Sequence, residues 1–216
     1  MASHFVKRLL IATTTITLAI AASPVEELAQ ACNVKAEIFN QLLNTSDYSV
    51  VDIGELAGLL QQPSEVITSW SAETRQFVLS EFAHEITNSL HELDPDFSLS
   101  EREVETDNSG LEKRVDERAQ YRAYERQLLS IHNTRVQSAN SGCFSHAACG
   151  ACVVAAGLAG TAGILGCVGT AIEAEILTAV PTFGVATAAI WVALGSCVTR
   201  VTGVAVAAFG TCHTLL

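Results

Sequence analysis

The last third of this chain has almost no charged residues. In residues 136–216 the only charged side chains are Glu173, Glu175 and Arg200. Residues 153–172 and 176–199 are uncharged and mostly apolar, and each is as long as the roughly 20 residues that a helix needs to cross a bilayer. This lack of charge excludes an ordinary surface helix with one polar face, so these segments must be buried in protein or in lipid.

The chain also lacks the residue patterns of several functional classes. It has 23 acidic and 12 basic residues, a net charge of −11, and no basic patch, which excludes a typical nucleic-acid-binding protein. We find no nucleophile with a matching base and no glycine-rich phosphate loop, so we do not expect an enzyme. The spacing of His146, Cys149 and Cys152 suits zinc ligands, but no second cluster of ligands follows. We therefore expect no cofactor and no metal.

Charge and cysteine both change at one dibasic site, Lys113-Arg114. Residues 23–114 contain 18 acidic and 5 basic residues, whereas residues 115–216 contain 5 of each. Six of the seven cysteines follow Arg114. Residues 98–114 are polar, without an apolar period, and are expected to form an exposed linker that a protease can reach. The sequence predicts cleavage after Arg114, which would separate an acidic pro-region from a hydrophobic product.

Residues 1–22 have the three parts of a signal peptide. Lys7 and Arg8 are followed by 13 uncharged residues, and Ala19-Ile20-Ala21 supplies the small residues of a cleavage site. A second suitable cleavage site lies at Ala31. The uncharged stretch is shorter than the roughly 20 residues of a membrane anchor. We expect a secreted, extracellular protein.

Residues 23–97 are predicted to form an acidic, helical pro-domain. Apolar residues recur at helical spacing in residues 34–43 and 50–60, and a third helix is expected to begin at Pro63-Ser64. A fourth begins after Ser71 and ends before Asp94-Pro95, since proline ends a helix. Asn44 begins the only N-glycosylation sequon, which predicts a modified surface site. The fold class expected for the whole chain is all-α.

The predicted product contains a charged amphipathic helix over residues 115–140 and a hydrophobic domain over residues 141–216. Its six cysteines are expected to form disulfides, which an oxidising compartment permits. They are Cys143, Cys149, Cys152, Cys167, Cys197 and Cys212. Six cysteines allow 15 pairings, and the sequence does not choose among them. Cys152 and Cys167 are 15 positions apart, as are Cys197 and Cys212; this is about 22 Å along a helix, so neither pair can bond while helical. We expect helices bridged to one another at both ends.

The uncharged segments of the product are predicted to form a helical hairpin with a third helix after it. Glu173 and Glu175 are expected at the tip of the hairpin, and residues 201–216 in the third helix. Glycine occurs at every third position in the first segment, and such small residues let helices approach closely. The expected packing ridge consists of Gly157, Gly160, Gly163, Gly166 and Gly169.

The order of leader, acidic pro-region, Lys113-Arg114 and cysteine-bearing product resembles fungal secreted preproproteins matured by a kexin-type protease. Killer toxins and secreted effectors of fungi have this architecture. The resemblance implies a fungal source, a kexin-type processing protease that cuts after Arg114, and a toxin or effector role.

Three functions remain open at this point. The first is a membrane-active toxin or antimicrobial protein, whose hydrophobic hairpin inserts into a target-cell membrane. The second is a secreted effector or structural protein, in which the apolar helices form a buried core. The third is an integral membrane protein with two or three spans. The sequence also leaves open whether the pro-region stays bound as a partner and whether the product is a homo-oligomer.

Overall fold

The computed structural model of this chain describes residues 23–97, 123–124, 126–134, 138, 147–178 and 185–212. These residues form α-helices and two short 3-10 helices and include no strand, which confirms the predicted all-α class. The expected signal peptide, the expected linker with Lys113 and Arg114, and Cys143 lie outside the described residues.

Residues 23–97 form a group of helices that we call the N-terminal cap. Its α-helices are α2 (Pro24–Ala31), α3 (Ala36–Asn44), α4 (Ser64–Thr68) and α5 (Ala72–Leu93), and its 3-10 helices are η2 (Tyr48–Val50) and η3 (Ile53–Leu56). Helix α5 follows the capping residue Ser71 and ends before Asp94, as predicted. Helix α2 was not predicted, although Ser23 and Glu26 form a reciprocal capping box at its start.

The helix predicted over residues 50–60 is wrong. Apart from Val50, the last residue of η2, only Ile53–Leu56 are helical there, in a short 3-10 helix, and most of the residues around them form turns and bends. The carboxylate of Asp52 accepts a hydrogen bond from the backbone N–H of Gly54, two residues further on. Asp47 makes the same bond to Ser49. Such local bonds give the backbone an alternative to an α-helix, while the apolar side chains are still buried.

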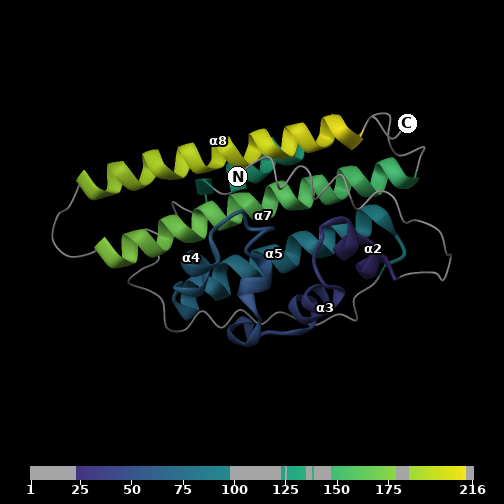
Figure 1. Cartoon of the computed structure of the whole chain (residues 1–216), viewed down its shortest axis with the longest axis horizontal. Helices are drawn as coiled ribbons and strands as arrows, with labels where there is room; N and C mark the ends of the chain where they lie inside the picture. The colour runs from purple at the N-terminus through teal and green to yellow at the C-terminus, as the bar shows by residue number, and fades with distance from the viewer. Residues whose placement is uncertain are drawn as a thin grey trace.

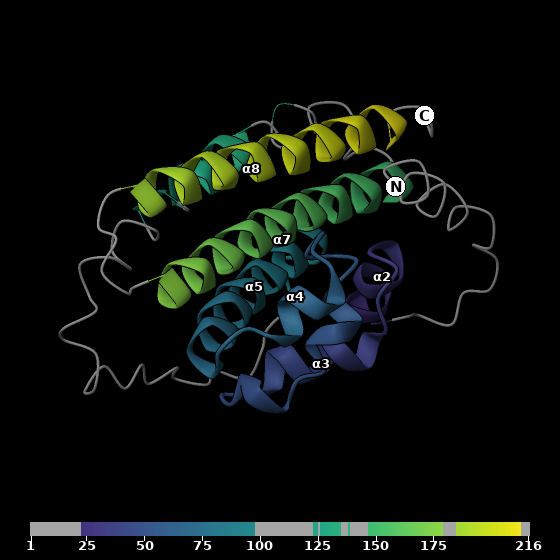
Figure 2. The ribbon, with the colours of Figure 1, turned by 60° about the vertical axis from the view of Figure 1, so that its left-hand side comes forward.

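The hydrophobic part of the chain forms two long helices, α7 (Ala147–Thr178) and α8 (Val185–Cys212), which lie side by side and antiparallel (Figures 1 and 2). Disulfides join Cys152 to Cys212 and Cys167 to Cys197, with Cα–Cα distances of 5.7 Å and 5.9 Å. The predicted bridging between helices is therefore confirmed, but not its placement at both ends, because Cys167–Cys197 lies near the middle of the two helices. The equal spacing of the cysteines on each helix lets both bridges form in one antiparallel register.

The predicted third helix over residues 201–216 is wrong. Helix α8 continues through Arg200 without a break as far as Cys212. Arg200 is exposed, so its charge stays in solvent and need not end the helix. The two segments that the sequence separated at this charge are one helix.

The molecule has three layers, with α7 in the middle (Figure 2). Helix α8 covers one side of α7, and the N-terminal cap, mainly α5, covers the other. Buried residues of the cap, of α7 and of α8 belong to one continuous hydrophobic core. Both long helices are long and apolar enough to cross a membrane, but the apolar stretch of α7 is 89% buried within the protein and that of α8 only 28%.

Candidate functional site

The candidate functional site is the interface between α7 and the N-terminal cap. This interface covers the most apolar helix of the molecule with a separate part of the chain. Three groups of contacts, spread along α7, form it. Each is built below from its residues.

The first contact is a carboxylate at the start of α5. Glu173 Oε2 accepts hydrogen bonds from the backbone N–H of Ser71 at 3.1 Å, the hydroxyl of Ser71 at 3.0 Å and the hydroxyl of Thr74 at 2.7 Å. The N-terminus of a helix has unpaired N–H groups and a positive end of its dipole, which favour a negative charge there. Glu173 is 9% exposed, so these donors replace the water that its charge has lost.

This arrangement corrects the predicted position of Glu173 and Glu175. The sequence placed both residues at the tip of the hairpin, but both lie inside α7, which continues to Thr178. A negative charge in an apolar run suggested a turn, because a buried charge is costly without partners. Glu173 instead has its partners in the N-terminal cap.

The second contact is the segment of residues 60–62, which lies against the middle of α7. The backbone carbonyl of Leu60 touches Gly166, and the side chain of Gln61 lies beside Gly163. Gln61 has a φ of 54°, in the left-handed region that residues other than glycine rarely adopt. The amide of Gln62 lies 3.3 Å from Cys197 Sγ, so this segment also reaches the Cys167–Cys197 disulfide.

The third contact is a free cysteine of the cap. Cys32 Sγ lies 3.9 Å from the carbonyl oxygen of Ala155 on α7, and the thiol is buried. Burial raises the pKa of Cys32 to about 12, because a thiolate would lose its hydration. The thiol is therefore protonated and unreactive at neutral pH.

No disulfide joins the N-terminal cap to α7 or α8 among the described residues. The two bridges above lie between α7 and α8, Cys149 is also disulfide-bonded, and Cys32 is free. Within the part of the chain that the structure describes, the cap is therefore held to α7 by packing and hydrogen bonds alone.

The glycines of α7 lie on more than one side of the helix. A Cβ at Gly169 would lie 2.7 Å from Val78 and 3.0 Å from Trp70 of the cap, whereas Gly160 faces Ala205 of α8 and His132. Since each step of three residues turns about 60° around a helix, positions 160 and 169 point in opposite directions. The row of glycines thus winds from the side of α8 to the side of the cap.

Sequence analysis missed one buried residue of this region, His132. It is 3% exposed, its Nε2 lies 2.9 Å from the carbonyl oxygen of Gly157, and its ring lies near Phe209 of α8. The described residues around it are helical, as predicted for residues 115–140. His132 follows Leu128 by four positions and Leu129 by three, and this spacing is the signal in the sequence that could have identified it as a buried residue.

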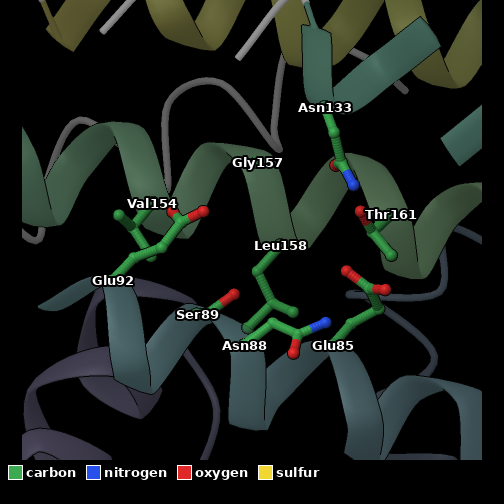
Figure 3. Close-up of a pocket in the computed structure, with 9 residues that line it drawn as sticks. All are labelled: Glu85, Asn88, Ser89, Glu92, Asn133, Val154, Gly157, Leu158 and Thr161. Carbon is green, nitrogen blue, oxygen red and sulfur yellow. The ribbon is translucent and has the colours of Figure 1, made fainter. Parts of the chain in front are cut away.

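A polar cavity of about 210 Å³ opens between α5 and α7 (Figure 3). Glu85 and Glu92 extend from α5 toward α7, and Thr161 and Asn133 face them from the opposite wall. Burial raises the pKa of both Glu85 and Glu92. No group of three or more metal-ligating side chains occurs among the described residues.

Asn44 is exposed near the end of α3, and its amide donates a hydrogen bond to the carbonyl of Asn40 at 2.8 Å.

Comparison of the chain with known protein families, with curated proteins and with solved structures gives no match.

Proposed function

We propose that this chain is the precursor of a secreted, membrane-active toxin or antimicrobial protein. In this proposal a kexin-type protease cleaves after Arg114, and the hairpin of α7 and α8 then inserts into the membrane of a target cell. The observation that carries the proposal is that an apolar, membrane-length helix is covered by a part of the chain that, among the described residues, has no disulfide to it.

The cap covers the most apolar helix of the molecule. Burial of apolar surface is worth about 25 cal/mol per Å², so a bare α7 would be strongly unfavourable in water. The cap supplies this burial in the precursor, for example through the side chains of Trp70 and Val78. Loss of the cap would leave α7 in need of another apolar environment, and a lipid bilayer supplies one.

The two disulfides would keep α7 and α8 together while the hairpin moves from the cap into a membrane. They join α7 to α8 at two levels, so the helices stay paired when the cap departs. The outer side of α8 is already apolar and exposed, with Val192 74% and Val206 52% exposed. A hairpin with one apolar face exposed and another under a separable cap is suited to insertion.

A second function is favoured by the burial of α7. If the cap never leaves, α7 is the core helix of a soluble secreted effector or structural protein, and its composition reflects burial on all sides. The 89% buried fraction of its apolar stretch supports this alternative.

Dye release from lipid vesicles distinguishes the two functions. The precursor is purified and treated with a protease specific for dibasic sites, beside a matched Lys113→Ala/Arg114→Ala variant. We expect the cleaved chain to release the dye and the uncleavable variant to release none. Absence of release by the fully cleaved chain from both neutral and anionic vesicles, even at a dilution at which a bound cap would separate, would refute the membrane-active toxin and leave the soluble protein.

A further inference from the structure

We infer that the N-terminal cap is a specific, reversible inhibitor of the α7–α8 hairpin, which stays bound after cleavage and is held in register by Glu173. The inhibitory role rests on the proposed function, whereas the binding does not. The partner of the cap is thus the hairpin of its own chain, recognised through an apolar helix face and one buried carboxylate.

The shape of the interface indicates specific recognition. A pro-region that acted only by its charge would need no close contact with the helix that it solubilises. Here a backbone carbonyl, that of Leu60, touches Gly166, and Trp70 and Val78 pack where Gly169 has no side chain. A side chain at either glycine would collide with the cap, so this surface of α7 is complementary to this partner.

The exposed surface of the cap carries many acidic residues, whereas the most buried carboxylate of the interface comes from the hairpin. Acidic residues on α2, α3 and α4 are exposed to solvent; these are Glu26, Glu27, Glu37 and Glu65. The carboxylate buried at the interface, Glu173, belongs to the hairpin, and its donors Ser71 and Thr74 belong to the cap.

Glu173 also determines where the cap sits along α7. An apolar helix face allows a partner to slide, because apolar contacts are not directional. The carboxylate of Glu173 receives its hydrogen bonds at one position of the cap along α7, where Ser71 and Thr74 lie against it. Any shift of the cap by a helical turn would leave this charge buried without donors, which is strongly unfavourable.

Reversibility follows from the chemistry of the cysteines. Among the described residues Cys32 is the free thiol at the interface, and its neighbour on α7 is a backbone carbonyl and not a cysteine. The cap can therefore leave without reduction of a disulfide. The reactivity of the Cys32 thiol also measures the separation of the cap, because this thiol is buried while the cap is bound.

The test starts with the full chain cleaved at Lys113-Arg114 and kept under native, non-reducing conditions. We expect the two fragments to co-elute in size-exclusion chromatography and to appear as one complex in native mass spectrometry. Cys32 should react with a thiol reagent only as fast as the fragments separate on dilution. Separation of the wild-type fragments immediately after cleavage would overturn the inference.

Two variants test the role of Glu173, one on each side of the interface. Glu173→Gln and Thr74→Val should each weaken the complex by about 10- to 100-fold, since hydrogen bonds to a charged group are among the strongest. The double variant should lower the binding free energy by less than the sum of the two single variants, because both remove the same interaction. Glu65→Gln, an exposed glutamate of the same cap, is the matched control and should bind as the wild type.

The inhibitory role is read from vesicles treated with these cleaved proteins at equal concentration. Dye release per mole should be higher for Glu173→Gln than for wild type and for Glu65→Gln. Equal binding by all three proteins, or equal release despite weaker binding, would refute the inference. A stable complex in which no protein releases dye even at high dilution would instead refute the proposed function and leave the binding intact.

Discussion

Gly166 is the residue at which the close approach of the cap and α7 is most demanding. A Cβ at this position would collide with the backbone carbonyl of Leu60, and a backbone atom cannot turn aside as a side chain can. Gly166→Ala should therefore lower the free energy of unfolding by about 1–3 kcal/mol, the usual cost of overpacking. Chemical denaturation of the purified precursor measures this change.

Gly203 on the exposed side of α8 is the matched control for that substitution. No atom lies within 4 Å of a Cβ built at this position. Gly203→Ala should leave the stability unchanged or raise it by up to about 1 kcal/mol, because alanine favours a helix more than glycine does. Equal effects of the two substitutions would show that helix propensity, and not contact with Leu60, determines the role of Gly166.

Individual residues differ in how far the sequence predicts their roles. The charge of Glu173 within an apolar run marks it as unusual, but its partners Ser71 and Thr74 lie about 100 positions earlier in the chain. A pattern based on local spacing cannot connect them. His132 is different, because its helical spacing from Leu128 and Leu129 is a local signal that would have predicted its burial, although it was not used for that prediction.

At the scale of elements, the sequence predicts the long helices and their bridging better than their ends. The two cysteine pairs with equal spacing imply bridges between helices, because a helix holds such cysteines about 22 Å apart. The break expected between residues 199 and 201 is wrong because a single exposed Arg200 does not interrupt a helix. The helix expected over residues 50–60 is wrong because Asp52 and its neighbours form local turns with the same apolar residues.

The Cys167–Cys197 disulfide is expected to stabilise the hairpin and the contact of the cap with it. It closes a separation of 30 residues, and Gln62 of the cap lies against Cys197. The double variant Cys167→Ala/Cys197→Ala should lower the free energy of unfolding by about 2–4 kcal/mol, the typical effect of losing a native disulfide. Thermal unfolding under non-reducing conditions measures this loss.

Cys32→Ala provides the control for the disulfide variant, because it removes a buried sulfur that forms no bridge. This substitution should lower the free energy of unfolding by less, about 1 kcal/mol or below, because it removes one small buried group. A disulfide variant as stable as Cys32→Ala would mean that packing alone holds α7 and α8 together.

At the scale of the whole molecule, the position of the cap against α7 is what the sequence does not predict. The acidic half and the apolar half differ in composition and therefore look like separate units. The apolar side chains that contact α7, such as Trp70 and Val78, follow the same helical pattern as those that fill the interior of the cap. Periodicity identifies buried faces, but it does not say which segment buries them.

The cavity between α5 and α7 makes the stability of the whole precursor depend on pH. Burial raises the pKa of Glu85; nearby Glu81 and Glu92 raise it further, and His84 and a hydrogen bond with Asn88 oppose the shift. Burial raises the pKa of Glu92 as well. The described residues of α7 and the facing segment that line the cavity carry no charge against these carboxylates. A raised pKa means that these carboxyl groups bind protons more tightly in the folded protein than in the unfolded chain, so their contribution to stability is fully present below the ordinary pKa of 4.5 and falls as pH rises above it.

Urea unfolding at pH 5, 6 and 7 should therefore give a free energy of unfolding that decreases with increasing pH over this range. Glu85→Gln removes one carboxylate from the cavity, so it should raise the stability at pH 7 and reduce the dependence on pH. Glu65→Gln, on the exposed surface of α4, should leave that dependence unchanged. A stability that increases from pH 5 to pH 7, or a Glu85→Gln protein with the slope of the wild type, would show that these carboxylates are hydrated in the folded protein. In that case the cap would cover α7 less closely than the contacts of Gly166 and Glu173 require.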